Sequence, residues 1–202
     1  MAPGTTATPA CFYFDLASPL AYLAAERILH ALPGPAQWRP VRAERLPDGV
    51  LPSFRCQQEL DAFRDDVERR ARALRLQPLR WPEPMPFDSA FAMRVATYAR
   101  SIGRAVPFAQ AAFRQAYAGG RSLAEHDSVL IAAAACEMHP AAVLKAAGLR
   151  ATAEELERET ESALGAGVRG VPAIVLDAQV YEGEQALERA AERMHDGVVD
   201  PA

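Results

Sequence analysis

Residues 11–24 read CFYFDLASPLAYLA and contain the signals that decide the fold class. The apolar, aromatic run at 11–14 is typical of a buried strand. Ser18 and Pro19 predict the start of a helix, because serine is a preferred N-cap and proline is favoured at the first helical position. Apolar residues then recur at helical spacing as far as Leu32, so we expect one helix from residue 19 to residue 32.

Both ends of the chain alternate strands with helices. Residues 38–41 predict a second strand parallel to the first, which completes a β-α-β unit. Towards the C-terminus, Thr152 and Glu155 predict a capping box that opens a helix. The apolar residues 171–176 predict a strand, and Asp177-Ala178 predicts a tight turn into a further short strand and a closing helix.

The middle of the chain has a different character. Residues 60–74 carry apolar side chains every three or four positions with charges between them, which is the pattern of an amphipathic surface helix. A proline-rich stretch follows at 78–86, where a continuous helix is excluded. Further helical patterns extend to about residue 149, so this part of the chain is expected to be all helix.

Composition and charge exclude several classes of protein. The 202 residues include 22 Lys+Arg and 26 Asp+Glu, a formal net charge of −4, which gives no basic surface for nucleic acid or an anionic membrane. The first ten residues lack both Lys/Arg and an apolar run, so no signal peptide is expected. Nowhere do about 18 uncharged apolar residues run together, so no membrane span is expected. Cys11, Cys56 and Cys136 form no C-x-x-C pair, so we predict a cytoplasmic protein without disulfides.

The sequence does not support three familiar kinds of site: a dinucleotide site, a serine-hydrolase elbow and a metal site. Gly165, Gly167 and Gly170 match the dinucleotide fingerprint, but a helix precedes them and a strand follows, which is the reverse of the required order. No G-x-S-x-G elbow is present. The histidines lack the spacing of metal ligands, so neither a nucleotide nor a metal site is expected. The histidines are His30, His126, His139 and His195.

Ser18 and Pro172 each admit two interpretations. Ser18 can be simply an N-cap, or its hydroxyl can stabilise a thiolate at a helix start that favours anions. Pro172 precedes an apolar strand, where it can be an ordinary trans proline at a strand start. Alternatively, the Val171–Pro172 bond is cis and turns the Val171 main chain outward to pair with a peptide-like ligand.

The sequence FYFDLASPLAYLA at 12–24 and the sequence GVPAIV at 170–175 together resemble the 2-hydroxychromene-2-carboxylate isomerases and the kappa-class glutathione transferases. These families belong with the DsbA-like thioredoxin-fold proteins. The sequences MPFD at 85–88 and AMR at 92–94 are similar to the helical insertion of the same families.

The resemblance implies an α/β, thioredoxin-like fold with a large all-helical insertion domain. We expect a discontinuous thioredoxin-like domain at 10–45 and 150–196, with the helical insertion at 46–149. Residues 1–9 are expected to form a disordered leader.

The resemblance also implies a glutathione site. Ser18 and Ala21 stand where a redox C-x-x-C would have its cysteines, so dithiol chemistry is excluded there. The resemblance implies that Ser18 contacts the glutathione sulfur. It also implies that Val171, the residue before Pro172, pairs with the main chain of the tripeptide. Glu184 and Gln185 stand at the place of the acidic residue that helps hold the glutamyl end, and Arg55 is the nearby upstream cation for the carboxylates.

The implied activity is glutathione-dependent cis–trans isomerisation of an aromatic-degradation intermediate, through thiolate addition, bond rotation and elimination. A transferase similar to the kappa class and a non-catalytic thioredoxin-fold binding protein are the alternatives. The relatives suggest a homodimer. Five side chains of the insertion are candidates for contact with the aromatic substrate, namely Trp81, Phe87, Phe91, Met93 and Tyr98.

Overall fold

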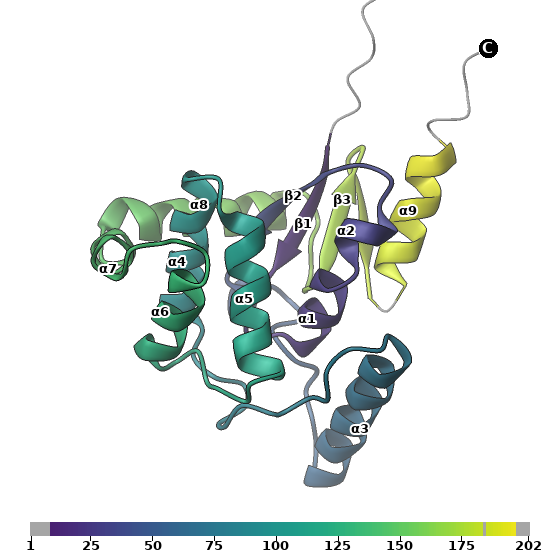
Figure 1. Cartoon of the computed structure of the whole chain (residues 1–202). Helices are drawn as coiled ribbons and strands as arrows, with labels where there is room; N and C mark the ends of the chain where they lie inside the picture. Colours follow the sequence, from purple (N-terminus) through teal and green to yellow (C-terminus); the bar gives the residue numbers. More distant parts are fainter. Residues whose placement is uncertain (1–8, 184, 197–202) are drawn as a thin grey trace, which may run out of the picture.

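The computed structural model of the chain describes residues 9–183 and 185–196, so all but the last residue of the predicted leader at 1–9 lies outside the described residues. The described residues fold around a four-stranded sheet with the strand order β2-β1-β3-β4 (Figure 1). β1 pairs in parallel with β2 and antiparallel with β3, and β3 pairs antiparallel with β4. The strands are β1 (Ala10–Phe14), β2 (Ala36–Pro40), β3 (Ala173–Leu176) and β4 (Gln179–Glu182). The first and third strands are neighbours, so the two ends of the chain build one sheet.

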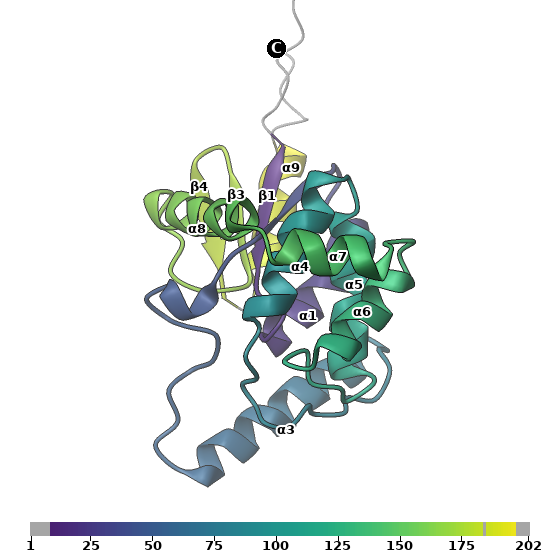
Figure 2. The same ribbon diagram turned by 90° about the vertical axis from the view of Figure 1, so that its left-hand side faces the viewer.

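Alternate residues of β1, β3 and β4 belong to two different cores. Phe12, Phe14 and Ile174 belong to the larger core, on the face that α1 (Pro19–Ala25), α2 (Ile28–Ala31) and α9 (Ala186–Asp196) cover. Tyr13 and Ala173 belong to the second core, on the face that α8 (Arg150–Gly165) covers (Figure 2). The start of α1 and the start of β3 meet at one end of this sheet.

Between β2 and α8 the described chain is helical. The elements are the 3₁₀ turn η1 (Ala43–Arg45), α3 (Gln57–Ala73), α4 (Ala90–Ser101), α5 (Ala105–Tyr117), α6 (His126–Ala134) and α7 (Pro140–Ala147). α4 and α5 pack against β2, and α5 also packs against α1. α3 stands away from the other helices and contacts α1 (Figures 1 and 2). The predicted α/β fold with a helical insertion is confirmed.

An aromatic cluster fixes α5 against the sheet and α1. The Phe14 ring lies 5.8 Å from Trp38 of β2 and 5.9 Å from Phe113 of α5, between centroids. Tyr22 of α1 stacks on Tyr117 of α5 at 5.4 Å. Burial of each such side chain contributes about 1.5–3 kcal/mol, so these contacts hold the start of α1 in place.

The helix expected from residue 19 to residue 32 is in fact two helices, and the single-helix prediction is wrong. α1 ends at Ala25, and α2 begins at Ile28. The side chains at the break bind partners far along the chain: Glu26 binds Arg114 of α5, and Arg27 binds Glu188 of α9. Periodicity within residues 19–32 carries no information about these partners.

The predicted capping box is also wrong. α8 begins at Arg150 with Leu149 as its N-cap, two residues before Thr152. The Thr152 hydroxyl donates a hydrogen bond of 2.7 Å to the carbonyl oxygen of Ala146, in the last turn of α7. The hydroxyl that a local cap would use is therefore engaged by the preceding helix.

Two predicted connections are confirmed. Asp177 and Ala178 both have positive φ, 49° and 61°, as a two-residue hairpin turn between β3 and β4 requires. Residues 165–170 connect α8 to β3, and Gly167 has a φ of 90°, a conformation that favours glycine. Among the helices of the described residues, none combines the length and apolar composition of a membrane span.

Candidate functional site

Ser18 is the N-cap of α1, and its hydroxyl is enclosed. Its Oγ accepts a hydrogen bond of 3.2 Å from the Ala21 N–H, as an N-cap should. The same hydroxyl donates to the Val171 carbonyl oxygen at 3.5 Å, the outer limit for such a bond. Ser18 is 0% exposed, so a ligand sulfur can reach the hydroxyl only if the surrounding chain moves.

The chain before β3 presents a cis proline next to Ser18. The Val171–Pro172 peptide bond is cis, which is the second of the two arrangements considered from the sequence. Glu182 of β4 holds the residues that lead into this bond, because its Oε1 accepts the N–H groups of Arg169 at 2.6 Å and Gly170 at 3.0 Å. The residues before Pro172 are thus held by hydrogen bonds to β4, the edge strand of the sheet.

Asp48, which follows the 3₁₀ turn, makes two further contacts with the same segment. Its N–H donates to the Arg169 carbonyl oxygen at 2.8 Å, and its carboxylate binds the Arg169 guanidinium at 3.0 Å. The next residue, Gly49, forms an isolated parallel bridge with Gly170. The segment before Pro172 is therefore held from two parts of the chain, β4 and the residues after the 3₁₀ turn.

A buried carboxylate lies at the end of β1, three residues before Ser18. Asp15 accepts the N–H groups of Ala17 at 2.9 Å and Ala43 at 3.0 Å, which joins the end of β1 to the turn after β2. Burial raises the pKa of this carboxyl above its ordinary value, although the two N–H groups oppose the shift. Asp15 therefore fixes the backbone that leads into the N-cap.

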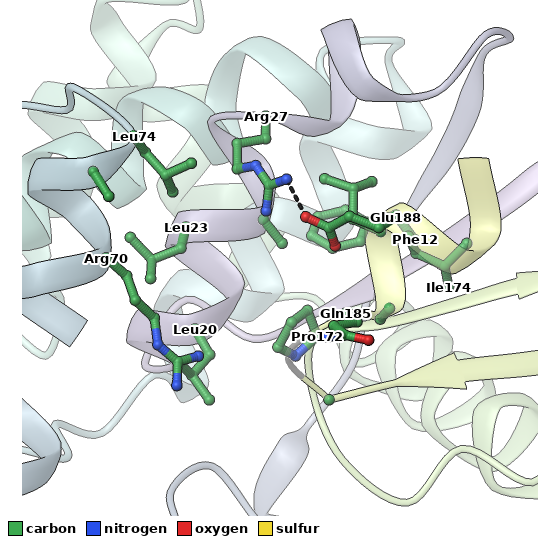
Figure 3. Close-up of a pocket in the computed structure, with 15 residues that line it drawn as sticks. Phe12, Leu20, Leu23, Arg27, Arg70, Leu74, Pro172, Ile174, Gln185 and Glu188 are labelled. Atoms are coloured by element: carbon green, nitrogen blue, oxygen red, sulfur yellow. Dashed lines mark hydrogen bonds and ion pairs between the residues drawn. The ribbon is translucent and has the colours of Figure 1, made fainter. Parts of the chain in front are cut away.

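A cavity of about 480 Å³ opens beside Pro172, between α1, the end of α3 and the start of α9 (Figure 3). This volume is within the range of about 300–1,000 Å³ that is usual for small-molecule sites. Phe12, Leu23 and Ile174 contribute to its apolar lining. A ligand placed here would lie against the first strand, the first helix and the cis proline.

Charged side chains of both signs line the cavity, and the sequence analysis missed them. Arg27 lies between α1 and α2, Arg70 lies in the last turn of α3, and Glu188 lies in the first turn of α9. Arg27 forms an ion pair with Glu188, and Arg70 binds Asp66 within α3. Each of these residues falls on an ordinary polar position of a helix pattern, so no local signal distinguishes it.

The structure brings only some of the predicted site residues to the cavity. Pro172 and Gln185 line it, whereas Ser18 and Val171 are buried and are not among its lining residues. Arg55 does not reach it: this residue precedes α3, its side chain is 90% exposed, and it is paired with Glu59 in the first turn of α3. Arg70 is near the other end of that helix, about 20 Å away along its axis.

The remaining predicted positions take other roles or lie outside the described residues. Glu184 is outside the described residues, so the structure says nothing about it. None of the five proposed substrate-contacting side chains of the insertion lines this cavity. Met93, for example, is buried and accepts the Leu16 N–H on its sulfur at 3.3 Å.

No group of metal-ligating side chains is present within residues 9–183 and 185–196. The cysteines are unpaired: Cys11 is half-buried, Cys56 is exposed and Cys136 is buried. Burial raises the pKa of the Cys136 thiol. None of these cysteines lines the cavity.

Comparison with protein families gives a match to the DSBA-like thioredoxin domain over residues 11–195. The chain belongs to the DSBA-like thioredoxin domain family. The match spans both halves of the sheet and the helices between them. A search of curated proteins finds no match.

Several solved structures share the fold of this chain at low sequence identity. One is a 2-hydroxychromene-2-carboxylate isomerase, with a TM-score of 0.83 and 20% identity, covering 95% of this chain and 96% of that one. A probable DsbA oxidoreductase from Streptomyces coelicolor has a TM-score of 0.77 and 22% identity, covering 96% and 91%. The cytosolic disulfide reductase DsbM from Pseudomonas aeruginosa, solved with GSH, has a TM-score of 0.61 and 16% identity, covering 94% and 95%.

Proposed function

We propose that this chain is a glutathione-dependent cis–trans isomerase of the 2-hydroxychromene-2-carboxylate isomerase type, acting on an aromatic-degradation intermediate. The observation that carries the proposal is the cavity beside Pro172, lined by apolar side chains and by charges of both signs. Ser18 and Ala21 supply no thiol, so a reaction that uses sulfur in this cavity requires a thiol from outside the chain. Similarity to a solved isomerase of that type supports the same choice.

The residues of the cavity fit glutathione. Glutathione has two carboxylates and an ammonium group, which call for cationic and anionic partners, and the cavity offers Arg27, Arg70 and Glu188. Its peptide groups call for main-chain partners; Pro172 of the cis bond lines the cavity, and Val171 lies directly before it in the chain. When bound, glutathione would supply a thiolate nucleophile for reversible addition to a conjugated double bond.

The role of the chain is to position the ligands and to favour the ionised thiol. If the surrounding chain moves to admit the ligand sulfur, the Ser18 hydroxyl at the start of α1 would favour its thiolate form by donating a hydrogen bond to it. The hydroxyl proton is held only by the long 3.5 Å contact with Val171, so it can turn towards a better acceptor while Oγ remains the N-cap. The apolar lining would hold the aromatic part of the substrate out of water.

Calorimetric titration with glutathione tests binding, and a pH titration of thiolate absorbance in the complex tests ionisation. We expect the wild type to bind glutathione and to lower the pKa of its thiol. Ser18→Ala should return that pKa towards the value of the free tripeptide, whereas Ser18→Thr retains a hydroxyl and should preserve part of the shift. Absence of binding at millimolar glutathione would refute the proposal.

An activity assay separates the isomerase from a transferase similar to the kappa class. The wild type should interconvert 2-hydroxychromene-2-carboxylate and its ring-opened isomer only when glutathione is present. Consumption of glutathione with a general electrophile, without isomerisation, would support the transferase instead.

The enclosure of Ser18 supports a second candidate, a binding protein without catalysis. Because Ser18 is 0% exposed and already caps α1, its structural role is complete without a ligand. Binding of glutathione with an unshifted thiol pKa, and no turnover in either assay, is the result expected from that candidate.

A further inference from the structure

An ion pair crosses the rim of the cavity between two helices that are distant in the sequence. Figure 3 shows the Arg27 guanidinium beside the Glu188 carboxylate, near Pro172 and Gln185. Their side chains are 30% and 44% exposed, so both partners are within reach of a ligand. The pair thus presents adjacent positive and negative charges to the cavity.

Because this ion pair is exposed, a charged group of a ligand can replace either partner at little cost in free energy. Solvent-exposed ion pairs typically contribute about 0–1 kcal/mol to stability, because water competes for both partners. A ligand that carries a carboxylate and an ammonium group on one carbon can replace both partners at once. Arg27 and Glu188 would then each still have a partner of opposite charge, so neither charge is left uncompensated.

Other features of the site favour the same exchange. Glu188 lies in the first turn of α9. Partial burial by itself would raise the pKa of Glu188, but the hydrogen bond and charge of Arg27, together with a backbone hydrogen bond at Glu188 itself, outweigh it, so the net pKa is below the ordinary value. The carboxylate is therefore charged at neutral pH and available to an ammonium group.

We propose that the Arg27–Glu188 pair recognises an α-amino-acid end of the ligand, with Arg27 binding its carboxylate and Glu188 binding its ammonium group. This inference rests on the proposed function, since the γ-glutamyl residue of glutathione has such an end. It assigns the charge selectivity of the cavity to two residues that lie 161 positions apart. The opposing interpretation is that the pair only ties α2 to α9.

Two glutathione analogues test the two charges separately. Glutaryl-cysteinylglycine lacks only the α-ammonium group, and γ-aminobutyryl-cysteinylglycine lacks only the α-carboxylate. By calorimetry, the wild type should bind each analogue about tenfold more weakly than glutathione, the size expected for one charge-assisted contact. The analogues test the inference without any change to the protein.

Two variants then assign each charge to a residue. Glu188→Gln should bind glutathione and the glutaryl analogue equally, and Arg27→Gln should bind glutathione and the γ-aminobutyryl analogue equally. Glu137→Gln is the matched control, because Glu137 is also an exposed carboxylate paired with an arginine, Arg104 at 2.8 Å, and does not line the cavity. The control should retain both preferences.

The outcomes separate this inference from the proposed function. If the wild type binds glutathione but does not distinguish it from the analogues, the inference is wrong and the proposed function stands. If the variants retain the wild-type preferences, the pair is only a tie between helices. If the wild type binds none of the three at millimolar concentration, both proposals fail.

Discussion

Removal of the Glu182 carboxylate should loosen the segment that precedes Pro172. In the folded chain, one oxygen of Glu182 accepts the N–H groups of Arg169 and Gly170. Glu182→Ala removes both hydrogen bonds at once. The change lies on the edge strand β4, so the main core should be unaffected.

The magnitude follows from these two hydrogen bonds. Hydrogen bonds to charged groups contribute about 1.5–3 kcal/mol, but Arg169 is exposed and water can replace part of its contact. We therefore expect local opening to become easier by about 2 kcal/mol, which corresponds to about 30-fold faster amide exchange.

Hydrogen exchange measured by NMR at the Arg169 and Gly170 amides tests this expectation. Glu182→Gln keeps an oxygen acceptor and should show a smaller increase. The amide of Val175, inside β3 and opposite Val180 rather than Glu182, serves as the internal reference. Unchanged exchange at Gly170 in Glu182→Ala would show that Glu182 does not hold this segment.

Three further changes probe the end of β1, the start of α1 and the end of α5, which packs against α1. Ser18→Ala should lower the free energy of unfolding by about 1–2 kcal/mol in urea titrations, and Ser18→Thr, which keeps the capping hydroxyl, should lose less; a loss below about 0.5 kcal/mol in Ser18→Ala would contradict the capping role. Burial raises the folded-state pKa of Asp15, so the folded chain binds this proton more tightly and stability should fall as pH rises from the ordinary aspartate pKa to the raised one. Asp15→Asn should flatten that part of the pH profile, and an unchanged slope would refute the assignment. Tyr117→Phe should raise stability by up to about 1 kcal/mol, because the buried hydroxyl has no hydrogen-bond partner among the described residues; a marked loss of stability would be evidence against this.

Most of the fold could be predicted because its signals are local. Ser18 and Pro19 mark the start of α1 through the chemistry of their own side chain and ring. Asp177 and Ala178 form the predicted turn between two short strands. Where a signal depends on distant partners it fails, as the break after Ala25 shows.

The sequence by itself determined the class of fold, the position of the N-cap and the absence of thiols at residues 18 and 21. Only the tertiary structure decided which charges line the cavity, because packing of α2 and α9 brings Arg27 to Glu188 across 161 positions. It also decided that Arg70 lines the cavity while Arg55 does not, because the direction of α3 places one end of the helix there. Spacing along the chain specifies neighbours within a helix or strand, whereas the convergence of separate elements depends on how their apolar faces pack.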